Sequence, residues 1–348
     1  MLRDFVNRRD KFYIYGAQVI AYGAFTAIRR LWDKTPAAFL VSNRTGNPAD
    51  IEGIPVRSPR DIPTEYPIVV AVTELLQREI VKILQAAGFT NIFCLTQHEE
   101  HLLMAAYYER INRFPPAVPS SGQTNADFVL YEVKNHRDKP LAAPPQLKDF
   151  ERTIQAGAAL TEEKLSAVTD NTGENISEKN KQYCEMTATY WVWKNTNHAW
   201  KGIEHYRRHL LVTPSLLTED TDVILPLPYI CYPHTMAQFG RFVGEDVVRA
   251  LFHSLQMLHP REYERYKSIL YGKYQYTYNL LCAREYVFDD YCAWFFRITA
   301  YMEKLGANVP ALSETRALSY VAEVLTNLYF MSKQDVWRVR HTEKAIYV

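Results

Sequence analysis

The sequence predicts an α/β protein built from two domains, and three observations support this prediction. Its 348 residues are more than a single hydrophobic core usually organises. Apolar strands alternate with amphipathic helices over the first hundred residues, which is the pattern of a parallel sheet. A stretch rich in Pro, Ser and Gly at 115–124 has the composition of a linker. We therefore expect an N-terminal domain at 1–97, a helical connector and linker at 98–125, and a second domain at 126–348.

The N-terminal domain is predicted to be a Rossmann-like parallel sheet, because its strands and helices follow in βαβ order. A glycine follows the first strand, and the helix before the last strand stops at Gly88. The expected elements, in chain order, are a strand at 11–15, a helix from Gly16 to about Leu31, strands near 37–41 and 67–72, a helix at 74–87 and a strand at 91–95.

The glycine-rich loop of this domain is a poor match to a dinucleotide site. Gly16 supplies the first glycine of G-x-G-x-x-G, but Gln18 and Ala21 stand where the other two belong. The second strand ends in Ser42 and Asn43, so no Asp or Glu is present to bind a ribose diol. An NAD-dependent module is therefore disfavoured. A structural or partner-docking role and a surviving nucleotide site both remain open.

The second domain is predicted to be α/β with extra helices. Its sequence opens with a strand and a polar turn and ends in long helices. The expected elements are a strand at 128–133, a turn at 134–138, an aromatic helix after the polar loop 170–180, strands at 199–206, 223–226 and 276–283, and helices at 287–305 and 316–330.

The strand at 199–206 ends in a cationic run, His205-Tyr206-Arg207-Arg208. If the strand continues through this run, alternation places His205 and Arg207 on one face and Tyr206 and Arg208 on the other. Ligands usually bind at the carboxyl ends of strands in α/β sheets, and guanidinium groups suit phosphate oxygens. A diphosphate is therefore the expected ligand. The alternative is that the arginines are surface or ion-paired residues and that His205 is a satisfied core histidine.

The composition of the chain argues against several classes of function. Forty basic and thirty-nine acidic residues leave a net charge of +1, which argues against nucleic-acid binding through bulk charge. The five cysteines show no CxxC pair, which favours reduced thiols in a cytoplasmic protein and predicts no zinc site. The charged N-terminus lacks the apolar core of a signal peptide, and no window is apolar enough to span a membrane. We expect a cytoplasmic protein, either soluble or peripheral at the inner membrane.

Several separated motifs resemble a bacterial family of capsular and exopolysaccharide glycosyltransferases that was long catalogued as a domain of unknown function. The resemblance covers roughly 127–330. Its motifs are Asp170-Asn171-Thr172-Gly173-Glu174-Asn175-Ile176-Ser177, Asn180, Tyr183-Cys184-Glu185, Tyr190 to Asn195, His205 to Arg208, Asp222 to Pro226, Tyr278-Asn279, Tyr291 to Phe295, and Arg316 with Glu323. The N-terminal half resembles Rossmann-like domains that precede bacterial sugar-processing enzymes, through Tyr15-Gly16-Ala17 and 51–56.

The resemblance implies a GT-A-like fold, in which a strand end receives the donor's diphosphate. Many GT-A enzymes carry an Asp-x-Asp metal clamp where this chain has His205-Tyr206-Arg207. An arginine pair can neutralise a diphosphate directly, so we expect catalysis that needs no metal, although the sequence does not exclude a divalent cation. A literal Asp-x-Asp at 220–222 precedes a strand and is interpreted as a cap or turn.

The resemblance and the residue chemistry together assign candidate roles. The donor-binding candidates are His136, Asp170, Asn171, Thr172, Gly173, Asn175, His205, Arg207 and Arg208. The acceptor-binding candidates are Tyr278 and Asn279, expected to close a late strand, and the unranked candidates for a catalytic acid or base are Glu323, Glu185 and Asp222. Purely structural alternatives stay open: a helix-capping loop with Ser177 as N-cap, an ordinary turn histidine at His136, and a structural ion pair between Glu323 and Arg316.

The resulting functional hypothesis is a glycosyltransferase that moves a hexose, galactose in pyranose or furanose form, from a UDP-sugar to a lipid-linked glycan in capsule, exopolysaccharide or O-antigen synthesis. The rival hypothesis is a non-catalytic nucleotide-sugar-binding or scaffold subunit of a polysaccharide assembly. The sequence leaves open the acceptor, the linkage, an inverting or retaining outcome, and whether the protein forms a homo-oligomer.

Overall fold

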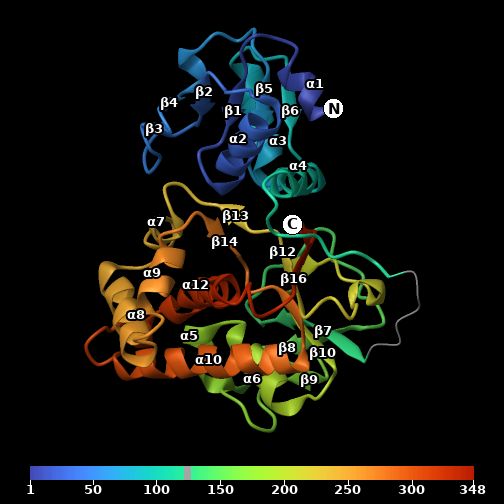
Figure 1. Cartoon of the computed structure of the whole chain (residues 1–348), viewed down its shortest axis with the longest axis vertical. Helices are drawn as coiled ribbons and strands as arrows, with labels where there is room; N and C mark the ends of the chain where they lie inside the picture. The colour runs from blue at the N-terminus through green and yellow to red at the C-terminus, as the bar shows by residue number, and fades with distance from the viewer. Residues whose placement is uncertain (121–126) are drawn as a thin grey trace. The chain divides into compact units, whose positions relative to one another are not determined.

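The computed structural model describes residues 1–120 and 127–348, so part of the predicted linker, 121–126, lies outside the described residues. The chain forms two compact units, each described here by itself (Figure 1). The first unit contains Met1–Phe114 and the short segment Tyr229–Pro233, and the second contains Pro115–Pro228 and His234–Val348. The predicted connector helix therefore lies in the first unit. The α/β class that the sequence predicts is confirmed.

The first unit is built on a sheet with the strand order β3-β4-β2-β1-β5-β6. Strands β1, β2, β4, β5 and β6 run parallel, in the order found in Rossmann-like sheets, and β3 joins the edge antiparallel to β4. The strands are β1 (Tyr13–Tyr15), β2 (Ala38–Leu40), β3 (Asp50–Ile51), β4 (Ile54–Arg57), β5 (Ile68–Val70) and β6 (Ile92–Cys94), and the helices are α1 (Leu2–Val6), α2 (Val19–Trp32), α3 (Glu74–Ala86) and α4 (Gln97–Arg110).

The glycine after β1 has a structural reason to be there. Gly16 has φ +120°, and a Cβ at this position would lie 2.7 Å from the carbonyl oxygen of Ala71. Gln18 begins α2 without a side-chain cap, and its amide donates to Asn47 at 3.0 Å. Packing between the first strand and its neighbour thus accounts for Gly16 without a ligand.

The second unit contains a mixed sheet with the order β16-β12-β15-β10-β7-β8-β9, and β11 and β17 extend it from β10. Strands β10, β7, β8 and β9 are parallel, whereas β15 runs antiparallel to both β10 and β12. The strands are β7 (Phe128–Lys134), β8 (Glu151–Gln155), β9 (Val168–Thr169), β10 (Trp200–His205), β11 (Arg208–Leu210), β12 (Val223–Pro226), β14 (Tyr274–Gln275), β15 (Leu281–Arg284), β16 (Val339–Thr342) and β17 (Lys344–Ile346), while β13 (Tyr229–Ile230) lies in the first unit.

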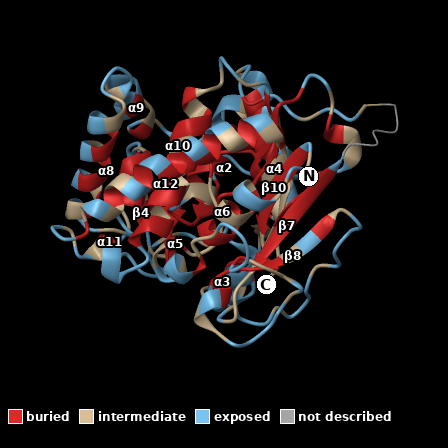
Figure 2. Ribbon diagram, turned by 90° about the horizontal axis from the view of Figure 1, so that it is seen from below, coloured by how far each residue is buried: buried red, intermediate tan, exposed pale blue. Residues whose placement is uncertain are grey.

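Helices cover one face of this sheet, with α10 lying along α6 and α12 (Figure 1). The central strands β7 and β10 are buried along almost their whole length (Figure 2). Lys201, near the start of β10, reaches the first turns of α10, where its ammonium lies 3.2 Å from Glu285 and 3.5 Å from Asp289. The helices are α5 (Asn180–Tyr183), α6 (Met186–Asn195), α7 (Thr235–Phe239), α8 (Glu245–Leu258), α9 (Tyr263–Leu270), α10 (Glu285–Lys304), α11 (Ala311–Glu314) and α12 (Ala317–Ser332).

Two predicted strands are wrong at the ends that carry site residues. The strand predicted at 199–206 stops at His205, and the chain turns back into β11. The strand predicted at 276–283 begins only at Leu281, because Tyr278 and Asn279 have positive φ values of 71° and 54° that no strand accommodates.

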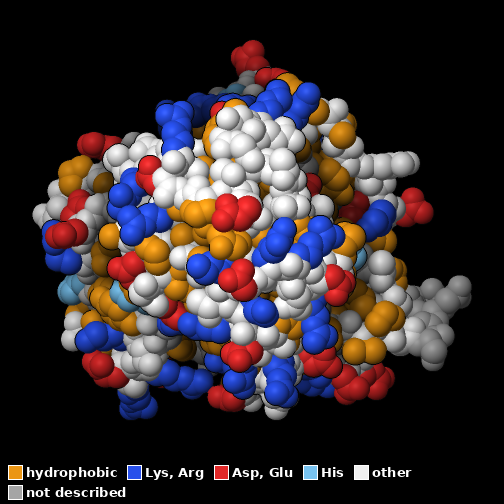
Figure 3. All heavy atoms as spheres, turned by 90° about the horizontal axis from the view of Figure 1, so that it is seen from above, with side chains coloured by type: hydrophobic (Ala, Val, Ile, Leu, Met, Phe, Trp, Pro, Cys, Tyr) orange, Lys and Arg blue, Asp and Glu red, His pale blue; other side chains and the backbone are white. Residues whose placement is uncertain are grey.

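The surface charges are mixed, as the net charge of +1 leads one to expect. On the face shown in Figure 3, basic and acidic side chains alternate without a large field of one sign. No helix in the described part of the chain is both long and apolar enough to cross a membrane.

Candidate functional site

Four neighbouring parallel strands of the second unit, β10, β7, β8 and β9, end at one edge of the sheet, which we call the carboxyl edge. Register places the ends of β10 and β7 side by side, with His205 opposite Val133, and the ends of β7, β8 and β9 follow in line. The residues delivered there are Asn135 to Asp138 after β7, Ala156 and Gly157 after β8, Asp170 after β9 and His205 after β10. Ligands of open α/β sheets usually bind at this edge.

The cationic run forms a tight turn, His205–Arg208, which we call the arginine turn. His205 pairs with Arg208 across the β10–β11 hairpin, and Tyr206 and Arg207 form its tip. The predicted alternation of His205 and Arg207 on one strand face is therefore wrong, because the strand ends before Arg207. Both sides of the tip are held by backbone hydrogen bonds, since Tyr206 donates to Val133 at 3.0 Å and Tyr347 donates to Arg207 at 2.8 Å.

Tyr278 and Asn279 meet the arginine turn and the start of α6. The Arg208 guanidinium lies 4.3 Å from the centre of the Tyr278 ring. The Asn279 amide donates to Glu185 at 2.9 Å, and its oxygen accepts from the Thr326 hydroxyl at 2.9 Å. A hydrogen-bond relay thus runs from α12 through Asn279 to Glu185.

Strained backbone is concentrated at this place. Besides Tyr278 and Asn279, Cys184 has φ 48° and ψ −127° immediately before Glu185. Positive φ is costly for non-glycine residues and persists only where the surroundings enforce it. The strain fixes the direction in which Glu185 leaves the short helix α5.

Arginines and a neighbouring carboxyl group at this place shift the pKa values of Glu323 and Asp138. Burial raises the pKa of Glu323 to about 7, and the nearby Glu185 adds to the rise while Arg208 and Arg316 oppose it. Burial also raises the pKa of Asp138 to about 6, against the effect of Arg207.

His205 is neutral in this setting. Burial, together with the charges of Arg208, Arg207 and Arg316, lowers its pKa to about 3. A neutral imidazole within a group of arginines can hydrogen bond to a ligand without adding charge.

Several buried polar atoms at the carboxyl edge have no hydrogen-bond partner within the part of the chain that the structure describes. They are Nδ1 of His136, Nδ1 of His205, Nε of Arg207 and Nε of Arg208. Leaving buried polar groups unpaired is costly, so such a concentration indicates a place where a ligand completes the hydrogen bonding. The cationic groups favour an anion.

Only the two ends of the polar loop, Asp170 and Ser177, lie by the turn after β8 among the residues of the loop 170–177. Asp170 is buried and accepts from the backbone amides of Gly157 at 2.8 Å and Ala158 at 3.0 Å, so it buttresses the turn after β8. Ser177 donates to Asp170 and is not a side-chain N-cap, which removes that alternative.

The Thr172–Gly173 bend packs against the far end of α6. The Trp191 indole donates to the Thr172 carbonyl at 2.9 Å, and a Cβ on Gly173 would lie 2.0 Å from the Asn195 amide oxygen. Glu185 stands at the opposite end of this helix, about 15 Å away at 1.5 Å per residue. The structure therefore does not bring the predicted donor residues Asn171, Thr172 and Gly173 together with the arginine turn, and Asn175 is occupied in the same loop with the Gly173 carbonyl.

Asp222 also lies apart from the site. It precedes β12 at the edge opposite the carboxyl edge. Val223 at the start of β12 pairs with Ala283, and Ala283 pairs with Lys201 near the start of β10, so the two strands begin at the same edge. Burial alone would raise the pKa of Asp222, but hydrogen bonds from Arg338 and Tyr286 lower it to about 2. Its two oxygens accept from Arg338 at 2.6 and 3.0 Å. Asp222 therefore forms a structural ion pair with Arg338 and lies too far from the site to act as its catalytic base.

Four residues of the site were not among the predicted ones. Arg137 and Asp138 belong to the turn after β7, and Arg316 precedes α12. Asn180 accepts from the Asn135 amide at 3.0 Å and donates to the Cys184 carbonyl at 2.7 Å, which ties the turn after β7 to the strained residue. The motifs of the family resemblance include Asn180 and Arg316, and the predicted turn at 134–138 includes Arg137 and Asp138, but none of the four has a predicted site role.

Comparison with known proteins agrees with this architecture. The fold is GT-A-like α/β. The chain is similar to the apo structure of WbbM, a bifunctional glycosyltransferase, with a TM-score of 0.51 and 24% identity over 63% of this chain and 45% of that one. This chain thus spans less than half the length of that protein. No curated protein matches the sequence.

A family model described as "Domain of unknown function (DUF4422)" matches residues 133–334, which is more than half of the chain. The chain belongs to this family. The matched span contains His136, Glu185, the arginine turn, Tyr278, Asn279, Arg316 and Glu323.

The separation of Asp222 from the site gives a first prediction. Asp222→Asn should lower the free energy of unfolding by about 1–3 kcal/mol, because it leaves a buried, charge-assisted hydrogen-bond pattern incomplete. Binding of ligands at the carboxyl edge should be unchanged. Urea titration and calorimetry with UDP on the same preparation measure both effects. Loss of UDP binding at unchanged stability would contradict the prediction and show that Asp222 belongs to the ligand site.

Proposed function

We propose that the second unit is a glycosyltransferase whose arginine turn binds the diphosphate of a nucleotide-sugar donor. The observation that carries the proposal is the set of unpaired buried donors on Arg207, Arg208 and His205 at the carboxyl edge. Arginine donors are matched to phosphate oxygens and carry permanent charge. The likeness of the fold to a bifunctional glycosyltransferase supports the same reading.

In this proposal the cations take the place of a bridging metal. Arg207, Arg208 and Arg316 act together on His205, so their charges converge on one small volume. Convergent positive charge stabilises a leaving diphosphate as it gains negative charge in the transition state. Donor binding and transfer would then proceed without a divalent cation at the diphosphate.

Glu323 is the best placed base. An inverting transfer requires that the acceptor hydroxyl oxygen attacks the anomeric carbon while the bond from that carbon to the diphosphate breaks, and that the hydroxyl proton moves to a base. Glu323, with a pKa of about 7, can take the proton near neutral pH. Glu185, fixed by Asn279, would hold a sugar hydroxyl, and Tyr278 would line the acceptor side.

The donor and acceptor proposed are the ones that the sequence resemblance implies. The donor is a UDP-hexose, with galactose first, and His136 contacts the base or ribose from the turn after β7. The acceptor is a lipid-linked glycan, reached in the cytoplasm at the inner membrane face. The chemistry of the site fits any nucleoside diphosphate sugar, so these identities rest on the resemblance.

Loss of one guanidinium tests the donor site. Arg207→Ala should raise the donor KM and lower kcat, each by about tenfold or more, because a charge-assisted hydrogen bond contributes about 1.5–3 kcal/mol. The matched control is Arg249→Ala, which removes an exposed arginine that pairs with Glu245 on the surface of α8. Equal kinetics for the two variants would remove Arg207 from the site.

Calorimetry with UDP and assays of transfer separate the enzyme from a binding subunit. We expect UDP to bind with an affinity that added Mn²⁺ changes by less than about twofold, and to find turnover of UDP-sugar when acceptor is present. Binding without turnover for any UDP-hexose and glycan acceptor would instead favour the scaffold subunit. Binding that requires Mn²⁺ would contradict a diphosphate site built from arginines.

The pKa of Glu323 predicts a pH dependence. Below pH 7 the carboxyl is protonated and cannot accept a proton, so kcat/KM should rise with pH and level off above about 7. Glu323→Gln should remove this limb and lower kcat by about a hundredfold or more. The matched control is Glu314→Gln, an exposed residue on the neighbouring helix α11. An unchanged pH profile in Glu323→Gln would assign the base elsewhere.

A further inference from the structure

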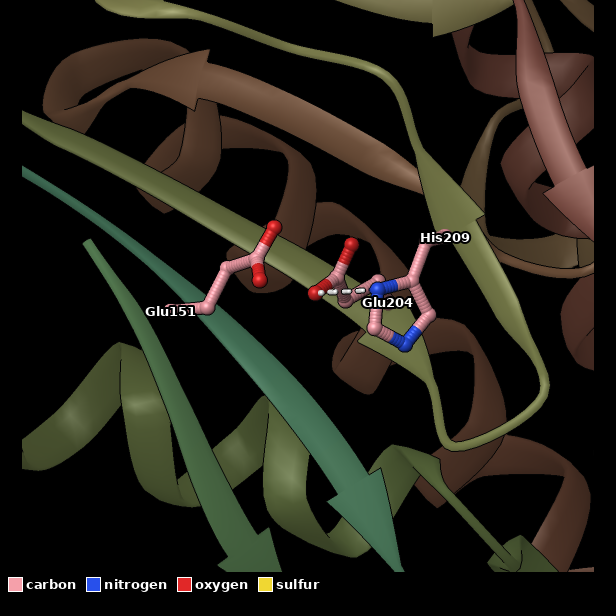
Figure 4. Close-up of side chains that lie close together, drawn as sticks. All are labelled: Glu151, Glu204 and His209. Atoms are coloured by element: carbon pink, nitrogen blue, oxygen red, sulfur yellow. Dashed lines mark ion pairs between the residues drawn. The ribbon is translucent and has the colours of Figure 1, made fainter. Parts of the chain in front are cut away.

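A second group of ionisable side chains lies on the other face of β10, away from His205. Glu204 is paired in register with Glu132 on β7, and the hairpin places His209 of β11 beside Glu204. Glu151 of β8 completes the group (Figure 4). The exposed fractions of Glu132, Glu204, Glu151 and His209 are 0%, 1%, 4% and 4%, so the group is sealed from solvent. The proposed transfer reaction uses none of these residues.

Each carboxylate has one oxygen fixed by the surrounding chain. Glu204 accepts from the Leu210 amide at 3.3 Å, Glu151 from the Lys148 amide at 2.7 Å, and Glu132 from the Thr153 hydroxyl at 2.7 Å. The other oxygens of Glu204 and Glu132, and Nε2 of His209, have no hydrogen-bond partner among the described residues. The Glu132 oxygen faces Nε2, and the Glu204 oxygen lies on the Nδ1 side of the same ring. A buried carboxylate oxygen without a partner beside Nδ1 indicates that something is held there.

The spacing of Glu151, Glu204 and His209 fits a metal site. One ligand atom each from Glu151, Glu204 and His209 lies within 4.8 Å of the others, and Nδ1 of His209 is 3.4 Å from Glu204. Two ligands on one ion, with bonds of about 2.0–2.2 Å, lie about 3.4 Å apart in a tetrahedral arrangement and at most about 4.4 Å apart. Small side-chain rotations would close the site.

The remaining carboxylate occupies the position of a supporting ligand. Nε2 of His209 lies 3.6 Å from Glu132, which is itself held by Lys134 at 3.1 Å. Histidines that bind metal through one nitrogen usually donate the other N–H to a carboxylate. Here Glu132 lies beside Nε2 of His209, while Nδ1 and Glu204 are on the side where the ion would bind, which is the same arrangement.

We propose that Glu151, Glu204 and His209 bind a divalent transition-metal ion, Zn²⁺ or Mn²⁺, and that Glu132 orients His209 from behind. Carboxylate and imidazole ligands suit these ions. A divalent ion offsets the charges of Glu151 and Glu204, and Lys134 offsets that of Glu132. Lys148 is the further cation beside Glu151. Such an ion joins β8, β10 and β11 directly behind the arginine turn, so its role is to hold the turn in place. This inference does not depend on the proposed transfer activity.

The competing arrangement uses protein cations only. A protonated His209 could lie between Glu132 and Glu204, and the Lys148 ammonium already reaches 3.6 Å from Glu151. Under that arrangement the group holds no metal and its stability does not respond to one. The two arrangements predict opposite effects of removing Lys148, since its ammonium competes with an ion for Glu151.

The test uses the full chain expressed in medium supplemented with Zn²⁺ and Mn²⁺ and then passed through gel filtration. Elemental analysis should find about one equivalent of metal, and removal by chelator should lower the Tm. Glu151→Gln and His209→Gln should lose the metal, whereas Glu178→Gln, an exposed control, should keep it. Lys148→Ala should bind the metal more tightly than the wild type.

Cobalt substitution covers the case in which the buried variants fail to fold. Co²⁺ bound to wild-type protein through an imidazole and carboxylates should give visible absorption bands that Lys148→Ala retains. A wild type that contains less than a tenth of an equivalent of any metal, shows no bands with Co²⁺ and has a Tm unaffected by added metal would overturn the proposal. Metal retained in both Glu151→Gln and His209→Gln would also overturn it.

Discussion

The parallel pairing of β10 with β7 is the constraint on which the site of the second unit depends. Its register runs without a break from Trp200 opposite Phe128 to His205 opposite Val133, so both strands end at the same level. The chain then turns at once into β11, and the cations of the turn stand beside the residues that follow β7. A slip of one residue would exchange the two faces of β10, turning His205 toward the face of Glu132 and Glu204 away from it.

The second constraint is the relay that joins the helices to the sheet edge. Thr326 on α12, Asn279 before β15 and Glu185 before α6 are distant in sequence, yet two hydrogen bonds of 2.9 Å connect them. Positive φ values at Cys184 and Asn279 are maintained because these hydrogen bonds and the surrounding core leave no relaxed alternative. Rigid placement of a carboxylate near guanidinium groups is what chemistry on a diphosphate requires.

The sequence predicted the elements of both sheets better than it predicted the site. Apolar runs and helical periodicity located β1, β5, β12 and α12 within a few residues, since their burial follows from local pattern. The turn after His205 and the left-handed residues Tyr278 and Asn279 carry no local signal, because long-range contacts impose them. Gly173 was interpreted as a ligand loop, but it is a glycine because Asn195 leaves no space for a side chain. The grouping of Glu185 and Glu323 with the arginine turn came from the resemblance to a family and not from spacing.

Strand alternation explains why one short segment can serve two different purposes. His205 points to the face where the arginines meet the carboxyl edge, and Glu204 points to the face where His209 and Glu132 are sealed. The sites are therefore separated by the thickness of a single sheet, close enough that Glu132 acts on the pKa of His205. A positive charge placed beside Glu204 would weaken that effect and favour the neutral form of His205 further. Charge on the buried face thus reaches His205 on the opposite face through the strand, without any movement of the chain.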